Sequence, residues 1–103
     1  MKPMRVYISG PITGTKDAGI RFADGVKKVL DVYPNAEIVN PVWLASTLPA
    51  LRHDEYMLIS FAALDACTHI FQLDKWQDSR GCNQELGYAY AKGIKVLEVD
   101  RNE

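Results

Sequence analysis

The strongest constraint on the fold is an alternation of short strand-like runs with longer helix-like segments. Four runs are rich in β-branched and aromatic residues, as strands are, and they cover residues 4–9, 36–40, 68–73 and 94–99. Helical periodicity predicts helices over residues 18–32, 51–66 and 79–92, with Gly93 ending the last one, and a short helical turn over residues 42–49. Strands that alternate with helices pair in parallel. We therefore predict an α/β fold, a doubly wound parallel sheet of four to five strands with helices on both faces.

Length and composition fit one domain with its own core. The chain has 103 residues, of which 48% are hydrophobic and 24% charged, and its formal net charge is -1. No run of Lys and Arg marks a nucleic-acid groove or a membrane surface, and no apolar stretch is long enough to span a bilayer. We expect a single domain over residues 1–103 whose partner is a small molecule, and neither nucleic acid nor a membrane.

The cysteines and histidines show no metal-binding pattern. Cys67 and Cys82 are too few and too far apart for a zinc site or a disulfide scaffold, so we expect reduced, buried thiols in a cytoplasmic protein. His69 lies in a predicted strand and is expected to be packed, whereas His53, near a helix start, is expected to face solvent. Neither has a partner at metal-ligand spacing, and we expect no metal or cofactor.

Ligands of doubly wound sheets bind at the carboxyl ends of the strands, near the point where the strand order reverses. Three loops follow strand ends here: SGPITGT at residues 9–15, NPVW at 40–43 and DKWQDSRG at 74–81. In the first loop, Gly10 and Gly14 allow the backbone to approach a ligand closely, and amides ahead of a helix suit a phosphate. The loop is neither a Walker loop nor the dinucleotide fingerprint, and a plain Gly-Pro turn is the alternative.

The other two loops each carry a tryptophan. Asn40 stands before a proline, which is a common turn opener, and Trp43 either stacks on a ligand or covers the core. In the third loop, Ser79 or the residue before it would cap the helix, and free amides beside Arg80 suit an anion. Trp76 could stack on a base or sugar. The alternative for this loop is a capped helix with a tryptophan lid on the core.

Glu85 stands out in the last predicted helix because no structural role is evident for it. With Ser79 as the cap, the capping-box position is Cys82, and Ala89 offers no ion-pair partner four residues on. The predicted apolar face, with Glu85 at its edge, is Cys82, Leu86, Ala89, Tyr90 and Gly93. Helical side chains lean toward the N-terminus, so the carboxylate would point back to the loops. Glu85 is a candidate nucleophile or base, and the alternative is a solvated glutamate near a helix start.

Two segments carry a resemblance to a known family. VYISGPITG at residues 6–14 and ELGYAYAKGIKV at residues 85–96 resemble the nucleoside 2-deoxyribosyltransferase-like superfamily, especially its short phage and bacterial members. They are also similar to the 2'-deoxynucleoside 5'-phosphate N-hydrolases. The resemblance spans nearly the whole chain and implies a flavodoxin-like sheet and a dimer or larger homo-oligomer. It also implies cleavage of an N-glycosidic bond through a covalent glycosyl-enzyme.

The resemblance gives particular residues a role. Glu85 would attack the anomeric carbon of deoxyribose, and Tyr7 would orient or polarise the Glu85 carboxylate. The loop that would contact the sugar or 5'-phosphate is Gly10, Pro11, Ile12, Thr13 and Gly14. The remaining predicted substrate-binding residues are Ser79 and Gly81, which match a second contacting segment, together with Asn40 and Trp76.

Two positions depart from the family pattern. Ser60 stands where the family has an Asp that helps to protonate the base or to hold the sugar, and Thr68 stands where short members have an Asp that opens the third strand. Asp65 and Asp54 are the nearby substitutes, although the spacing of Asp65 points it elsewhere on the helix. Loss of the acid would slow departure of the base by about 10²–10⁴-fold.

Two functions stay open on this basis. The first is an N-glycosidase or deoxyribosyltransferase acting on a 2'-deoxynucleoside or its 5'-monophosphate, which Glu85 and Tyr7 favour. The second is a non-catalytic module of the same fold that binds a nucleoside or nucleotide, which the missing acids favour. A flavodoxin-like electron carrier is disfavoured, because the first loop is poor in the Ser and Thr that hold a flavin phosphate.

Overall fold

The computed structural model describes residues 3–12, 16–42, 44 and 50–99. Its strands are β1 (Arg5–Ser9), β2 (Glu37–Val39), β3 (His69–Gln72) and β4 (Lys95–Val96). Its helices are α1 (Ala18–Val32), α3 (His53–Asp65), α4 (Arg80–Lys92) and the short 3-10 turn η1 (Trp76–Asp78). The predicted order of strands and helices is therefore present. The helical turn predicted over residues 42–49 lies largely outside the described residues.

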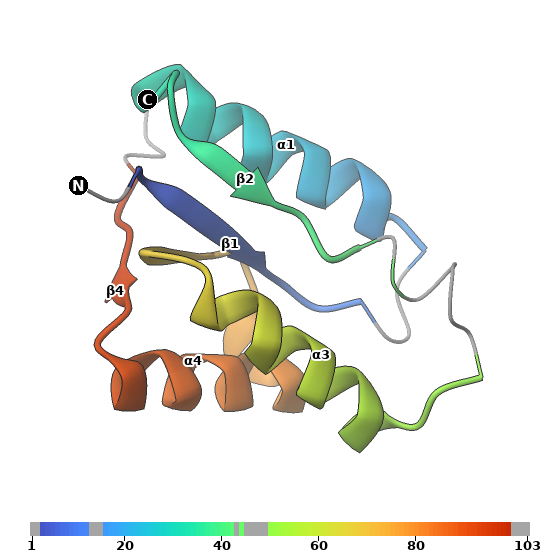
Figure 1. Ribbon diagram of the computed structural model, residues 1–103. Helices are drawn as coiled ribbons and strands as arrows, with labels where there is room; N and C mark the ends of the chain where they lie inside the picture. Colours follow the sequence, from blue (N-terminus) through green and yellow to red (C-terminus); the bar gives the residue numbers. More distant parts are fainter. Residues whose placement is uncertain (1–2, 13–15, 43, 45–49, 100–103) are drawn as a thin grey trace.

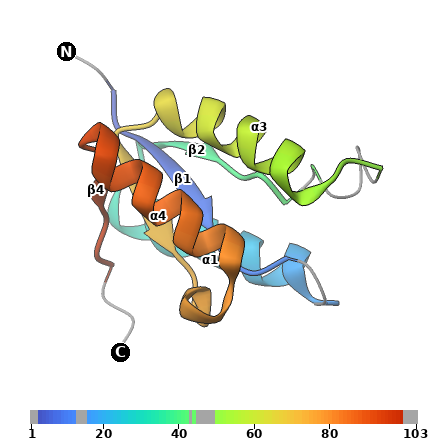
Figure 2. The same ribbon diagram turned by 90° about the horizontal axis from the view of Figure 1, so that it is seen from below.

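The described strands form one four-stranded sheet in the order β2-β1-β3-β4, and every pairing is parallel. Helix α1 covers one face of the sheet, and α3 and α4 lie on the other (Figure 1). Seen from below, α3 and α4 lie side by side on this face of the sheet (Figure 2). This is the strand order of flavodoxin-like folds, so the predicted fold class is correct. The order reverses between β1 and β3, whose carboxyl ends mark the expected ligand position.

Strand β1 divides the core into two clusters, because alternate residues of a strand point to opposite faces. Val6 and Ile8 point toward α1 and pack with residues that include Phe22, Val29, Phe71 and Leu97. Tyr7 points the other way and packs with Leu64, Cys67, Ile70, Ala89 and Ile94. Cys67 and Cys82 are both buried and free, as expected.

Two details of the elements differ from the prediction. Strand β4 spans two residues instead of the expected run over residues 94–99, although the Leu97 amide still donates to the Ile70 carbonyl at 2.8 Å. Ile20, counted in the apolar stripe of its helix, is 76% exposed. Within the described residues, no helix has the length and apolarity needed to cross a bilayer.

Candidate active site

Glu85 is buried, and both of its carboxylate oxygens accept a hydrogen bond from a hydroxyl group on β1. The Tyr7 hydroxyl donates to Oε2 at 2.7 Å, and the Ser9 hydroxyl donates to Oε1 at 2.7 Å. Residues 7 and 9 share one face of β1 because side chains alternate along a strand. Only 8% of Glu85 is exposed. The strand and the helix thus hold one carboxylate between them, away from bulk water.

Helix α4 places Glu85 in the middle of its buried face. Ser79 is the N-cap and its hydroxyl accepts from the Cys82 amide at 3.2 Å, as the sequence predicted for that position. The buried residues of the helix are Cys82, Glu85 and Ala89, whereas Tyr90 is 68% exposed. The predicted face was therefore wrong about Tyr90, and Glu85 lies within the face, not at its edge. Its hydroxyl partners make a carboxylate tolerable at such a position.

Burial sets the electrostatics of this group. Removal from water raises the pKa of the Glu85 carboxyl above its ordinary value. Hydrogen bonds from the hydroxyls of Tyr7, Ser9 and Ser60 oppose that rise. Burial, followed by the nearby Glu85 charge, raises the pKa of Tyr7, so the phenol remains a hydrogen-bond donor at any physiological pH.

Glu85 lies on the wall of a cavity of about 870 Å³ at the carboxyl ends of β1 and β3. The predicted site residues on the same wall are Tyr7, Gly10, Pro11, Ile12, Ser79 and Gly81. The cavity has the size of typical small-molecule sites. The predicted juxtaposition of the last long helix with the glycine-containing loop after the first strand is therefore present.

Asn40 and Trp76 do not line this cavity as far as the described residues define it. The Asn40 side-chain oxygen accepts from the Val42 amide at 3.2 Å, so it shapes the turn after β2. Trp76 is partly buried in η1. Thr13, Gly14 and Trp43 lie outside the described residues.

Gly10 has a packing reason to be glycine. A Cβ atom at Gly10 would lie 2.7 Å from Cδ1 of Leu73, too close for an ordinary contact. A side chain at position 10 would therefore require the Leu73 side chain, which follows β3, to shift. Close approach to a ligand is not needed to explain this glycine.

A family model described as "Domain of unknown function (DUF4406)" matches residues 4–98. The chain belongs to the DUF4406 family. Comparison with curated proteins and comparison with solved structures gave no match. Because the family description names no activity, the function of this DUF4406 domain has to be argued from its site.

Ser9, His53 and Arg21 are among the residues of this DUF4406 site that were not expected. Ser9 could have been found, since it lies two residues after Tyr7 and therefore on the same face of the strand. His53 was expected to face solvent, but it lines the cavity, and its Nε2 lies 2.8 Å from Gln84 Oε1. Arg21 also lines the cavity and donates from Nη2 to the Pro11 carbonyl at 2.9 Å. His53 lies on a helix distant in sequence from the loops, whereas Arg21 lies in the first turn of the helix that follows the first loop, ten residues after Pro11.

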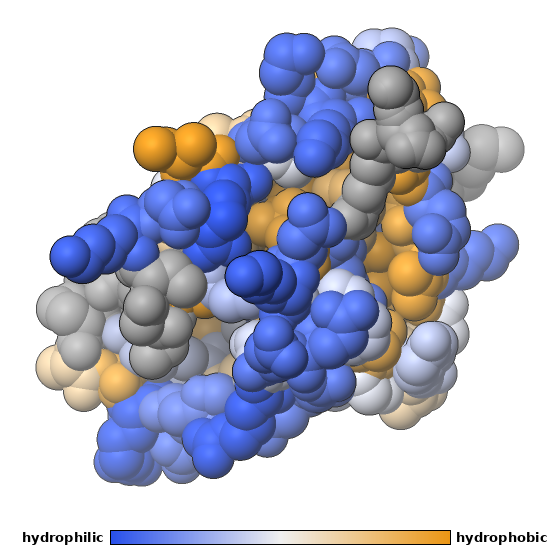
Figure 3. Space-filling model, turned by 180° about the vertical axis from the view of Figure 1, so that it is seen from behind, coloured by the Kyte–Doolittle hydropathy of each residue, from blue (hydrophilic) through white to orange (hydrophobic). Residues whose placement is uncertain are grey.

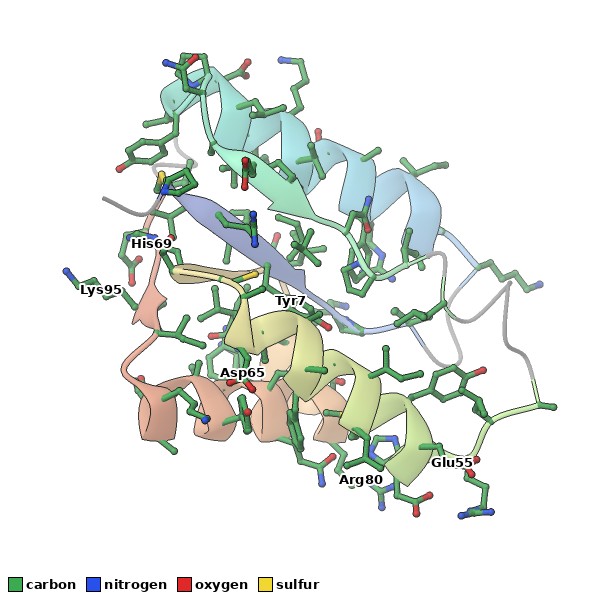
Figure 4. All side chains as sticks on the ribbon, viewed as in Figure 1. Tyr7, Glu55, Asp65, His69, Arg80 and Lys95 are labelled. Carbon is green, nitrogen blue, oxygen red and sulfur yellow. The ribbon has the colours of Figure 1, made fainter. Side chains whose placement is uncertain are left out.

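The two positions that depart from the pattern of the nucleoside 2-deoxyribosyltransferase-like superfamily, Ser60 and Thr68, lie in different places. Ser60 is 6% exposed and lines the cavity, near Tyr7 and Glu85. Thr68 lies at the opposite, amino-terminal edge of the sheet, where its hydroxyl accepts from the Arg5 amide at 3.0 Å. Figure 4 shows the same separation, with His69 and Lys95 at one end of the sheet and Arg80 toward the other. An acid at position 68 would not reach the Glu85 cavity.

Neither of the substitute acids reaches the cavity wall. Asp65 accepts from the Tyr88 hydroxyl at 2.7 Å and lies 3.5 Å from the Lys92 ammonium. Asp54 is exposed, 3.4 Å from Arg52 Nε. Within the described part of the chain, no group of three His, Cys, Asp or Glu side chains could hold a metal ion.

Proposed function

We propose that this DUF4406 domain cleaves, or transfers at, the N-glycosidic bond of a 2'-deoxynucleoside or its 5'-monophosphate. The observation that supports this most is the buried Glu85 carboxylate on the wall of a cavity of about 870 Å³. This carboxylate accepts hydrogen bonds from the hydroxyls of Tyr7 and Ser9. The resemblance of residues 6–14 and 85–96 to the nucleoside 2-deoxyribosyltransferase-like superfamily points to the same chemistry.

Glu85 acts as the nucleophile in the first half-reaction. One carboxylate oxygen bonds to the anomeric carbon, the carbon–nitrogen bond breaks, and its electron pair leaves with the base. Tyr7 stays protonated and keeps the other oxygen in place. Because the carboxylate is already out of water, attack does not require loss of a hydration shell.

In the second half-reaction, water or a second base attacks the same carbon and releases Glu85 as a carboxylate. The stereochemical logic is that of retaining glycosidases, in which two displacements restore the original configuration. A cavity open to solvent admits either acceptor. Hydrolysis and transfer therefore use the same Glu85 intermediate and differ only in the acceptor.

The departing base meets no dedicated acid among the described residues. Ser60 offers a hydroxyl, and the carboxylates on the cavity wall other than Glu85 are Asp17, Asp74 and Asp78. A hydrogen bond from Arg21 lowers the pKa of Asp17, which makes it a weak proton donor at neutral pH. Asp74 and Asp78 are exposed. We therefore expect slow turnover, fastest for bases that leave without prior protonation.

The sugar and any 5'-phosphate would lie against the start of α4. Ser79 and Gly81 line the cavity there, as does Arg80, which supplies a cation. Amides at the first turn of a helix favour an anion. On this basis a 5'-monophosphate should bind more tightly than the free nucleoside.

A non-catalytic nucleotide-binding module is the second candidate. Ser60 supports it, because it stands where the nucleoside 2-deoxyribosyltransferase-like superfamily has an acid. The module would keep the cavity and the loops without turnover. Ligand binding without base release would distinguish it from the enzyme.

We also propose a cytoplasmic homo-oligomer. Free, buried thiols suit a reducing compartment. Leu58 on α3 and Tyr90 on α4 are 69% and 68% exposed, and both could be covered by a second copy. Figure 3 shows hydrophobic residues on the back of the molecule as well, set among hydrophilic ones. Sedimentation analysis would decide the number of copies.

The decisive experiment is a substrate panel. Purified protein is incubated with the common 2'-deoxynucleosides and their 5'-monophosphates, with and without a second free base, and released or exchanged base is measured by chromatography. The wild type should release base, and Glu85→Gln should not. Glu98→Gln, at an exposed glutamate, is the matched control and should behave as the wild type. Equal release by Glu85→Gln would exclude Glu85 as the nucleophile.

A further inference from the structure

The loop after β1, which forms part of the cavity wall, is held on both sides of Gly10. The Leu73 amide donates to the Ser9 carbonyl at 2.8 Å and so continues the pairing of β3 with β1. Arg21 Nη2 donates to the Pro11 carbonyl at 2.9 Å and ties the other side of Gly10 to α1. A larger side chain at position 10 therefore strains the loop, because a swing of the loop would break these hydrogen bonds.

Leu73 fills the space beside Gly10 and has little room to retreat. A Cβ atom at Gly10 would lie 2.7 Å from Cδ1 of Leu73 and 3.1 Å from its Cβ, so a change of rotamer alone would not clear the contact. On the opposite side, a Cβ atom at Gly25 of α1 would lie 2.5 Å from Cδ2 of Leu73. Leu73 is 8% exposed and is thus packed between the loop and the helix.

The steric reason for a glycine at position 10 is separate from its backbone conformation. Neither Gly10 nor Gly25 has a φ in the left-handed region, in contrast to Gly93 with a φ of 74°. An alanine could therefore adopt the backbone conformation of Gly10. Among the described residues, the nearest obstacle to its methyl group is the Leu73 side chain.

We propose that Gly10 is a positioning residue, whose lack of a side chain allows the neighbouring Ser9 to reach Glu85. The Ser9 hydroxyl donates to Glu85 Oε1 at 2.7 Å, a short charge-assisted bond that a small displacement would weaken. Ser9 is covalently joined to Gly10 and hydrogen-bonded to Leu73, so a methyl group at position 10 displaces Ser9. The inference rests on the proposed function, because it assigns Gly10 to the positioning of the nucleophile and not to contact with the sugar or phosphate.

The test is a double-mutant cycle of Gly10→Ala and Leu73→Ala that measures the Glu85 pKa. NMR titration of the side-chain carboxyl carbon, identified by its absence in Glu85→Gln, gives this pKa whether or not a substrate is turned over. Burial raises the Glu85 pKa and the Ser9 hydrogen bond opposes that rise, so Gly10→Ala should raise the pKa further. If the substrate panel shows base release, kcat/KM should fall by up to about tenfold. Both changes should be smaller in the Leu73→Ala background, which has room for the added methyl group.

Gly25→Ala is the matched control, because its methyl group meets the same leucine from the α1 side. Its close contact is with the terminal Cδ2, whereas Cγ is 3.7 Å away, so the end of the side chain can absorb it and the Glu85 pKa should not change. The titratable neighbours of Glu85, Tyr7 on β1 and Cys82 on α4, have pKa values raised by burial and stay protonated while Glu85 titrates. Leu73→Val, which lacks both δ carbons, replaces Leu73→Ala if that variant does not fold.

The possible failures can be told apart. An unchanged Glu85 pKa in Gly10→Ala would overturn the inference, and so would a rise that is undiminished when Leu73 is shortened. Weaker nucleotide binding with an unchanged Glu85 pKa would assign Gly10 to ligand contact instead. If the pKa follows the cycle but the wild type releases no base from the panel, Gly10 still positions the carboxylate and the proposed N-glycosidase function is wrong.

Discussion

The two faces of the sheet bury different kinds of side chain, although one strand supplies both. On the α1 side, Val6 and Ile8 of β1 meet a cluster made only of hydrophobic residues. On the side of α3 and α4, the alternate residues Tyr7 and Ser9 meet a carboxylate. A shift of one residue along β1 therefore separates an apolar core from a candidate active site.

This difference separates stability from chemistry. Apolar burial stabilises the fold, whereas taking a carboxylate out of water costs free energy that hydrogen bonds offset only in part. The raised pKa of Glu85 reflects that remaining cost. A protein selected for stability alone would place an apolar residue at position 85. Substitutions on the α1 face should therefore reduce stability and leave activity intact, and substitutions on the other face should do the reverse.

The largest expected effect is on the α1 face. Phe22→Ala removes a fully buried ring and should lower the free energy of unfolding by about 3–5 kcal/mol, through lost burial and the cavity left behind. Urea denaturation measures the loss, and base release per folded molecule should not change. Ile20→Ala, at an exposed site on the same helix, is the control. A folded but inactive Phe22→Ala protein would break the separation of the two faces.

Tyr7→Phe should show the opposite pattern. It keeps the buried ring but removes the donor to Glu85 Oε2, a charge-assisted bond of about 1.5–3 kcal/mol, so kcat/KM should fall by about 10- to 100-fold. The free energy of unfolding should change much less than in Phe22→Ala. Tyr88→Phe is the matched control, because the Tyr88 hydroxyl donates to Asp65 outside the cavity. A Tyr7→Phe enzyme with undiminished kcat/KM would remove the phenol from the mechanism.

The fold could be predicted from the sequence because its signals are local. Alternating strand and helix patterns define the parallel sheet, and Ser79 marks the start of α4 through a hydrogen bond within one turn. Strand β4 was overestimated because the apolar run at 94–99 continues beyond the residues that pair with β3. Periodicity reports which residues are apolar and not where a ladder ends.

The site was harder because its contacts join distant parts of the chain. Glu85 and Tyr7 are 78 residues apart, and their pairing came from a resemblance, since no local pattern encodes it. Helical periodicity misplaced Tyr90 for a related reason, since it treats a tyrosine as core and a glutamate as surface. His53 was missed because its partners, Gln84 and Arg80, come from another helix.

Ser9→Ala should have a smaller effect on activity than Tyr7→Phe, because a water molecule can replace a lost serine hydroxyl. We expect kcat/KM to fall by up to about tenfold. The Ser9 hydrogen bond lowers the pKa of Glu85, so its loss should raise that pKa further. The acidic limb of the kcat/KM profile, which reports ionisation of the free enzyme, should move to higher pH. A limb that stays in place or moves to lower pH would show that Ser9 does not act through Glu85.

The smallest effect is the difference in the free energy of unfolding between Glu85→Gln and the wild type at low pH. The informative measurement is how this difference changes as the pH rises. Burial raises the pKa of Glu85 above its ordinary value of 4.5, so the folded state holds the proton more strongly than the unfolded chain does. This contribution to wild-type stability is complete below 4.5 and is lost as the pH rises through the raised value. Glutamine does not titrate, and its amide can accept from Tyr7 and donate to Ser9. Urea denaturation from about pH 4 to about pH 8 should therefore show the variant gaining on the wild type as the pH rises. If the free energy of unfolding of Glu85→Gln instead fell relative to that of the wild type as the pH rises, the buried carboxylate would stabilise the fold. The separation of stability and chemistry between the two faces would then be wrong.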